Sequence, residues 1–161
     1  MSRPNDWSVA FAKQALADFE SWQLLSQLKQ DADRSLPQSQ ALHFLQMACE
    51  KLAKAHLCRR PKANPLEFQT SHAFIASTLP TIVEHTLHKR LPNASTTLLQ
   101  QRRKQAKHLF REIELLHPQV DDSGNVRVPV EHRFEALRLA DKQGGPELLK
   151  IVEDAIRSLC E

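Results

Sequence analysis

The chain has 161 residues, of which 41% are apolar and 25% are charged, a composition typical of one soluble globular domain with a hydrophobic core. Its three glycines and its lack of tyrosine argue against a turn-rich β protein and favour helices. The formal net charge of +3 is too small to indicate nucleic-acid binding by itself.

The cysteines and the ends of the chain bear on its compartment. Cys49, Cys58 and Cys160 are odd in number and form no Cys-x-x-Cys pair, which argues against a disulfide framework or a zinc ribbon and fits a reducing cytosol. The N-terminus lacks the apolar stretch of a signal peptide. The longest weakly polar run, residues 73–83, is shorter than the roughly 20 residues that span a membrane. We therefore expect a cytoplasmic protein with no membrane partner.

The first two predicted helices carry the clearest apolar patterns. Asp6 is expected to cap a helix that begins at Trp7 and fades near Gln30. Its apolar stripe has one polar member, Asp18; the stripe comprises Trp7, Phe11, Ala12, Leu16, Asp18, Phe19, Trp22 and Leu25. A second helix is expected from about Pro37 to Arg59.

Small side chains characterise the middle of this second helix. Ala48, Cys49 and Ala53 predict a close approach by a neighbouring helix, with Cys49 as a buried apolar residue. Glu50 and Lys54 have the i,i+4 spacing of an ion pair, and the simplest interpretation places them on a solvated face.

The middle of the chain alternates loops and helices. Residues 60–70 hold two prolines and are expected to form a loop, after which Thr70 or Ser71 caps a third helix. Pro80 should kink or split that helix. After a break at residues 91–95, Ser95 or Thr96 starts a long fourth helix that ends near Pro118.

The C-terminal part is expected to begin with a turn at residues 120–125 and an extended segment at 126–130, with a short helix at 131–140. Pro146 then opens the last helix. Its expected core face is Leu148, Leu149, Val152, Ile156 and Leu159. The prediction is a single all-α domain over residues 6–160, an up-and-down helical bundle of about five or six helices.

The segment ALHFLQMACEKLAKAHL, residues 41–57, resembles the second helix of the HEPN family, where small residues and glutamines precede an A-x-E-K-A-x-K-A core. SHAF at 71–74 is similar to the family's histidine at the start of the third helix. NVRVPV at 125–130 is similar to an Arg-Tyr-Pro segment, with Val128 in place of the aromatic residue. The resemblance spans most of residues 8–130 and implies a HEPN-like up-and-down bundle that forms a homodimer.

Many HEPN proteins are ribonucleases with an Arg-x4–6-His motif, and the resemblance makes Arg103 and His108 the candidate catalytic pair. Chance alone gives about two such spacings in a chain with this many arginines and histidines, so the motif needs structural context. On a continuous helix the two side chains point about 140° apart. They would converge only if a dimer partner completed the site. The pairs with this spacing are Arg102–His108, Arg103–His108, Arg111–His117 and Arg127–His132.

Periodicity divides the fourth helix into two faces. The expected core stripe is Leu99, Arg103, Ala106, Phe110 and Ile113. The expected solvent stripe is Lys104, His108 and Glu112.

The same helix carries a basic run, QRRKQAK at 101–107. Arg102, Arg103, Lys104 and Lys107 are candidates for binding the phosphates of RNA or a nucleotide, and Lys89-Arg90 is expected to lie nearby. No aromatic residues interleave for base stacking, so a simple solvated face is the alternative interpretation.

Metal ligands are too sparse to predict a metal site. Glu114 and His117 form one Glu-x-x-His, whereas di-iron bundles need two such motifs and two more glutamates. His85 and His88 are i,i+3 neighbours with no further ligand evident. We therefore expect no metal and no cofactor.

The sequence thus favours a non-catalytic HEPN-like interaction module that forms a homodimer. Two alternatives stay open. One is a metal-independent endoribonuclease of toxin type that uses Arg103 and His108. The other is a nucleotide- or RNA-binding partner of a nucleotidyltransferase, as some HEPN proteins are.

Overall fold

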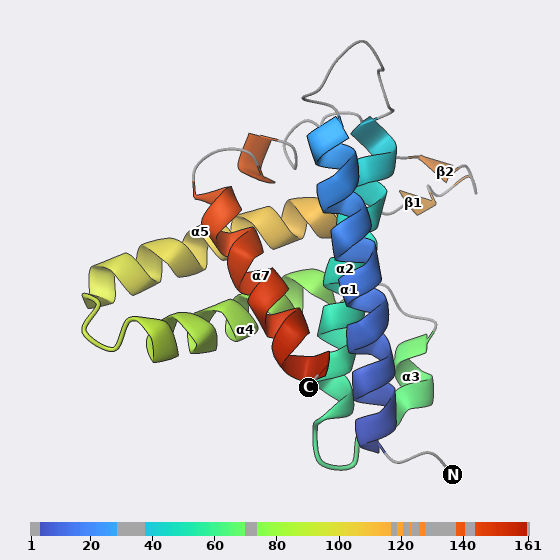
Figure 1. Ribbon diagram of the computed structural model, residues 1–161, viewed down its shortest axis with the longest axis horizontal. Helices are drawn as coiled ribbons and strands as arrows, with labels where there is room; N and C mark the ends of the chain where they lie inside the picture. The colour runs from blue at the N-terminus through green and yellow to red at the C-terminus, as the bar shows by residue number, and fades with distance from the viewer. Residues whose placement is uncertain are drawn as a thin grey trace.

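The computed structural model describes residues 4–28, 38–69, 74–116, 119–120, 123, 126–127, 138–140 and 144–160. These residues confirm the predicted all-helical architecture, to which a two-residue antiparallel ladder is added (Figure 1). No helix in this part of the chain is both long enough and apolar enough to cross a bilayer. The elements are α1 (Pro4–Leu28), α2 (Gln38–Cys58), α3 (Pro65–Gln69), α4 (Ile75–Arg90), α5 (Thr96–Glu114), β1 (Gln119–Val120), β2 (Val126–Arg127) and α7 (Gly145–Cys160), and residues 138–140 are also helical.

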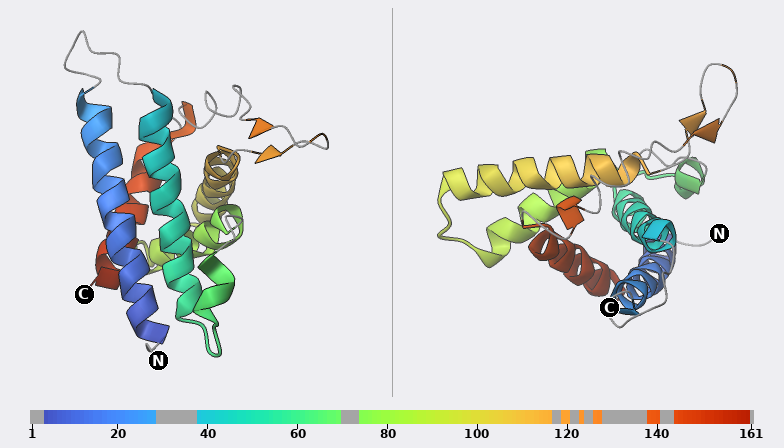
Figure 2. Two further views of the ribbon diagram at one scale, coloured as in Figure 1. Left: turned by 90° about the vertical axis from the view of Figure 1, so that its right-hand side faces the viewer. Right: turned by 90° about the horizontal axis from the view of Figure 1, so that it is seen from above.

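Two helical hairpins define the architecture. α1 and α2 run antiparallel along their length, and α4 and α5 form the second hairpin (Figure 1). The two views of Figure 2 show that the second hairpin crosses the first instead of running alongside it. α7 packs against both hairpins. α2 contacts α1, α4, α5 and α7. α2 is therefore enclosed on several sides, which decides the environment of its polar residues.

The core confirms the predicted small residues of α2 and the predicted core face of α7. Ala48, Cys49 and Ala53 of α2 have no exposed surface, and Phe19 of α1 is only 1% exposed. Small side chains on α2 let α1 approach closely. All five predicted core residues of α7 are buried, namely Leu148, Leu149, Val152, Ile156 and Leu159.

The start of α1 differs from the prediction. The helix begins at Pro4, so Asp6 lies in its first turn and is not a cap before Trp7. Proline is favoured at the first helical position because its missing N–H would have no partner there and its φ is already helical. Asp6 still favours this end of the helix through the macrodipole.

The prediction of a loop over residues 60–70 is wrong for Pro65–Gln69, which form α3. The Leu66 N–H donates to Asn64 Oδ1 at 3.2 Å, and Asn64 Nδ2 donates to Glu67 Oε1 at 3.2 Å. With Pro65 at the first position, this is a capping arrangement that starts a helix.

α4 begins at Ile75, and Thr70 and Ser71, the predicted caps, lie outside the described residues. Pro80 does not split the helix, because α4 continues through it to Arg90. Pro80 is buried, so packing around the ring stabilises the helix where one backbone hydrogen bond is missing.

The predicted boundaries of the last two long helices are close to those observed. Ser95 caps α5 by accepting a hydrogen bond from the Leu98 N–H at 3.2 Å, as predicted. α7 starts at Gly145, one residue before the predicted Pro146. A Cβ on Gly145 would lie 1.7 Å from the Leu139 carbonyl oxygen, so only glycine fits at this approach. Gly144 has a φ of +79°, a conformation that glycine adopts without strain.

The predicted surface pair Glu50–Lys54 is instead buried, which is a correction. Each residue is 1% exposed, and Lys54 Nζ lies 2.7 Å from Glu50 Oε1. Lys51 Nζ lies 3.7 Å from the same oxygen and is also largely covered. The prediction assumed one solvated face on α2, whereas this helix is packed against four others.

The predicted solvent stripe of α5 is correct for Lys104 and His108 but wrong for Glu112, which is 8% exposed. The C-terminal end of α5 is covered by two other helices. Gln46 Nε2 of α2 donates to the Glu114 carbonyl oxygen at 3.3 Å, and the Ala76 N–H of α4 donates to Glu114 Oε2 at 2.8 Å. The buried face of the helix is therefore wider at this end than periodicity predicts.

Candidate anion-binding site

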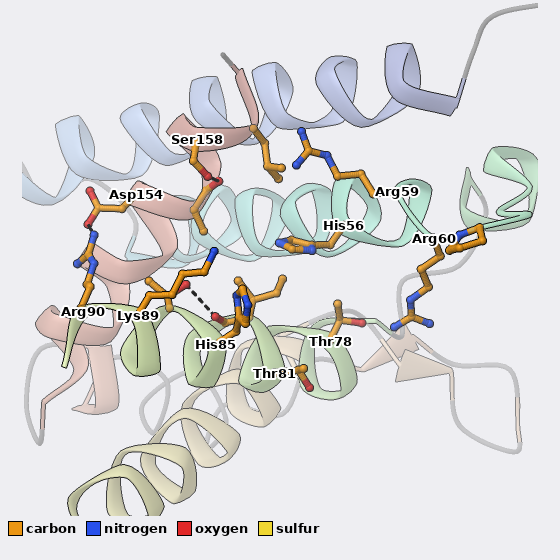
Figure 3. A pocket seen from close by; sticks show the side chains of 15 residues that line it. His56, Arg59, Arg60, Thr78, Thr81, His85, Lys89, Arg90, Asp154 and Ser158 are labelled. Carbon is orange, nitrogen blue, oxygen red and sulfur yellow. Dashed lines mark hydrogen bonds and ion pairs between the residues drawn. The ribbon is translucent and has the colours of Figure 1, made fainter. Parts of the chain in front are cut away.

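A groove of about 760 Å³ lies between the C-terminal end of α2, the length of α4 and the C-terminal half of α7 (Figure 3). Its volume is within the range of roughly 300–1,000 Å³ that ligand sites occupy. It exists because the two hairpins cross, which leaves the end of α2 facing α4. The described residues that line it are His56, Arg59, Arg60, Pro61, Thr78, Thr81, Ile82, His85, Thr86, Lys89, Arg90, Asp154, Ala155, Ser158 and Leu159.

The groove is strongly basic. Four Lys/Arg residues and one aspartate line it, which gives a formal charge of +3 with neutral histidines. This equals the formal net charge of the whole chain, so the residues outside the groove sum to zero formal charge. Arg90 pairs with Asp154, whereas Arg59, Arg60 and Lys89 have no ion pair within the described part of the chain. Such a surface attracts anions.

Two histidines lie between the ends of the groove. Figure 3 shows the His56 ring projecting from α2 and the His85 ring rising from α4 into the same space, with Lys89 reaching toward α2 beside them. Burial of the imidazole holds the pKa of His56 below its ordinary value, and the positive charges of Arg59, His85 and Arg60 act in the same direction. His56 is therefore neutral at pH 7 in the free protein, and an anion nearby would favour its protonated form.

Two hydroxyl groups of the groove donate their hydrogen atoms to backbone carbonyl oxygens. Thr86 Oγ1 donates to the Ile82 carbonyl oxygen at 2.9 Å, and Ser158 Oγ donates to the Ala155 carbonyl oxygen at 2.9 Å. Their oxygens are left as acceptors, which do not bind anions. Donors for an anion must therefore come mainly from the arginines, Lys89 and the histidines.

The four predicted phosphate-binding residues lie on α5, and none of them is among the described residues that line the groove. Arg102 pairs with Glu147 of α7, and its Nη1 also donates to Gln105 Oε1 at 3.2 Å. Arg103 Nη1 donates to Glu84 Oε1 of α4 at 3.3 Å. Lys104 and Lys107 are exposed. Half of the predicted basic run is therefore engaged in pairs between helices.

Arg103 was also predicted in the core stripe of α5, and this is wrong, since its side chain is 50% exposed. α5 is continuous from Thr96 to Glu114, so Arg103 and His108 lie about 140° apart around one helix. His108 is exposed. In the pairs Arg111–His117 and Arg127–His132, the histidine lies outside the described residues.

The described residues contain no group of three or more His, Cys, Asp or Glu side chains placed to hold a metal. His85 lines the groove, whereas His88, its i,i+3 neighbour, is exposed and does not line it. Cys49 is buried as predicted, and burial raises the pKa of its thiol to about 12, so it is not a nucleophile at neutral pH.

The sequence contained the elements of the groove without their arrangement. The second predicted helix ends at Arg59, next to Arg60, and the third ends at Lys89-Arg90, before the break at residues 91–95. Basic residues at helix C-termini are commonly attributed to the macrodipole. The pattern that could have indicated the site is that two successive helices end in paired cations. Protein-family models, curated proteins and solved structures give no match to this chain.

Proposed function

We propose that this protein is a non-catalytic binding module whose groove between α2, α4 and α7 holds the phosphate groups of a nucleotide-type ligand. The observation that carries the proposal is the convergence of Arg59, Arg60, Lys89 and Arg90 around one groove that contains a single described carboxylate. Arginine and lysine side chains are the usual phosphate donors in proteins.

The shape of the groove favours an extended ligand, such as an RNA oligonucleotide, over a mononucleotide. Arg60 lies opposite the N-terminal half of α4, and Lys89 and Arg90 lie at its C-terminal end (Figure 3). The helix rises roughly 18 Å between Thr78 and Arg90. Two cationic ends separated by this length suit a ligand with several phosphates. The histidine rings between them can stack on bases, as histidine does in RNA-binding proteins.

A HEPN-like relationship and a homodimer belong to the same proposal, and they rest on the resemblance of residues 41–57. A role as partner of a nucleotidyltransferase would be consistent with a binding groove. The ribonuclease alternative has less support, because Arg103 and His108 lie outside the groove and on different sides of α5. Light scattering tests the dimer: a mass of twice 18.4 kDa at tens of micromolar protein is expected, and a monomer would contradict it.

The proposal is tested by fluorescence anisotropy with labelled oligoribonucleotides of increasing length and with ATP as competitor. The double variant Arg59→Gln/Arg60→Gln should weaken binding by at least about tenfold, because charge-assisted hydrogen bonds to phosphate are lost. The matched control Lys104→Gln/Lys107→Gln removes the same charge from α5 and should change affinity less than about threefold. Wild-type affinity should fall steeply with added salt.

Three outcomes would contradict the proposal. Affinity that does not depend on salt excludes phosphate contacts, and an equal loss in both double variants excludes the groove as the site. Cleavage of the RNA in EDTA that is lost in His108→Ala would favour the ribonuclease. We expect the RNA to stay intact.

A further inference from the structure

One carboxylate opposes the positive charge of the groove. Asp154 of α7 is the only acidic residue among the described residues that line it, and it forms an ion pair with Arg90 of α4. Lys150, one turn earlier on α7, places its Nζ 3.6 Å from Asp154 Oδ1 and 3.0 Å from Glu153 Oε2. Asp154 therefore has two cations, one inside the groove and one outside it.

Asp154 is ionised at neutral pH. Burial opposes its ionisation, but the hydrogen bond and charge of Arg90, together with Lys150, hold the pKa of Asp154 below its ordinary value. In the free protein, one of the four Lys/Arg side chains of the groove is thus already occupied by an internal anion. An incoming phosphate at the Lys89 end must either share Arg90 with Asp154 or take it.

The exchange is feasible because Asp154 would keep a cation. When Arg90 turns to a ligand, Lys150 is still within ion-pair distance of the Asp154 carboxylate. The carboxylate is 27% exposed, so water also remains available to it. Its negative charge nevertheless stays beside the bound anion and repels it.

We propose that Asp154 is a built-in competitor for the ligand of the groove, which releases Arg90 only to an anion that binds the guanidinium better than a carboxylate does. The inference rests on the proposed function. A phosphodiester carries one negative charge, as a carboxylate does, whereas a terminal phosphate carries nearly two at neutral pH. Asp154 therefore makes this end of the groove selective for a terminal phosphate.

The test compares Asp154→Asn with Glu84→Gln, a matched control. Each variant removes one partly exposed carboxylate that pairs with an arginine, and Glu84 lies outside the groove. Binding of two oligoribonucleotides, identical except for a 5′-phosphate, is measured by anisotropy. Asp154→Asn should tighten binding of the unphosphorylated strand about fivefold, the effect of removing one charge about 4 Å away in a water-like dielectric. Glu84→Gln should change it less than twofold. The preference for the 5′-phosphate should be present in the wild type and in Glu84→Gln and reduced in Asp154→Asn.

Equal affinities for Asp154→Asn and Glu84→Gln would overturn the inference while leaving the proposed function intact, provided that Arg59→Gln/Arg60→Gln still loses binding. Weaker binding by Asp154→Asn would also overturn it, because Asp154 would then position Arg90 for the ligand. A phosphate preference unchanged in Asp154→Asn would overturn the selectivity. If the wild type binds neither strand, the proposed function fails and the inference fails with it. Thermal unfolding of each variant confirms that the fold is retained.

Discussion

The buried pair Glu50–Lys54 allows the sharpest test of the packing around α2. Both residues are 1% exposed, and Lys54 Nζ lies 2.7 Å from Glu50 Oε1. The perturbation is a double-mutant cycle with Glu50→Leu, Lys54→Met and the combination of the two. Glu50→Leu removes the carboxylate that lies 2.7 Å from the buried Lys54 ammonium, and Lys54→Met leaves the buried Glu50 carboxylate with the more distant Lys51, at 3.7 Å.

The magnitude follows from this burial. Breaking a buried ion pair by removing one partner costs about 3–5 kcal/mol, whereas replacing both partners with apolar residues of similar size is close to neutral. For a chain of this length, the loss corresponds to a decrease in Tm of roughly 6–20 °C for each single variant. The double variant should recover most of this decrease.

The assay is urea unfolding followed by circular dichroism, with Tm as a second measure. Glu84–Arg103 serves as the control pair, because its side chains are 32% and 50% exposed. Arg103→Met should cost less than about 1 kcal/mol, as exposed ion pairs do. If Glu50→Leu and Lys54→Met each cost no more than Arg103→Met, the pair behaves as a surface pair and the burial argument is refuted.

Four further results are expected. Ala48→Leu and Ala53→Leu should each overpack the α2 interface and destabilise the fold by about 1–3 kcal/mol, and an unchanged Tm for both would show that this face is not tightly packed. Gly145→Ala should destabilise the protein, although alanine normally stabilises a helix relative to glycine, because its Cβ would overlap the Leu139 carbonyl; a higher Tm would contradict the observed approach. Burial raises the pKa of Asp18 above its unfolded value, so the protein loses stability as pH rises from the unfolded to the folded pKa of this carboxyl. Asp18→Asn should therefore raise the urea midpoint at pH 7 and leave it unchanged near pH 3. A lower midpoint at pH 7 would show that the ionised carboxylate stabilises the fold. The lowered pKa of His56 means that this imidazole gains its positive charge only as pH falls, so affinity for a phosphate ligand should rise as pH falls from 8 to 5. The rise should be smaller in His56→Asn. Equal pH profiles for the two proteins would exclude His56 from the site.

The sequence was sufficient for the long helices because their apolar spacing and caps are local properties. α2 and α5 follow their predicted ranges closely, and Ser95 caps α5 as expected. The short helix α3 was missed although Asn64-Pro65-Leu66-Glu67 contains a capping signal, because the two prolines nearby indicated a loop.

The errors on the faces of helices have a common physical cause. Periodicity assigns one face of a helix to solvent, but it does not count how many neighbours a helix will have. α2 has four, so Glu50 and Lys54 are buried, and the end of α5 meets both α2 and α4, so Glu112 is buried too.

The candidate site also depends on which helices become neighbours, and the sequence pattern does not show this. Arg59-Arg60 and Lys89-Arg90 are visible in the sequence as two separate basic pairs, 29 residues apart at the nearer ends. Their convergence requires the crossing of the two hairpins, which no local pattern contains. The predicted phosphate-binding site was placed on the run at 101–107 instead, because it holds four cations in seven residues. The sequence does not show that two of these cations, Arg102 and Arg103, pair with Glu147 and Glu84.

If phosphates bind between α2 and α4, the histidine side chains of the groove report on the binding directly. Imidazole NMR spectra of the protein, recorded during titration with an oligoribonucleotide, distinguish the groove from the α5 surface. We expect the ring signals of His56 and His85 to shift and the pKa of His56 to rise on binding, while the His108 signals stay in place. Shifts confined to His108, with His56 and His85 unchanged, would contradict it.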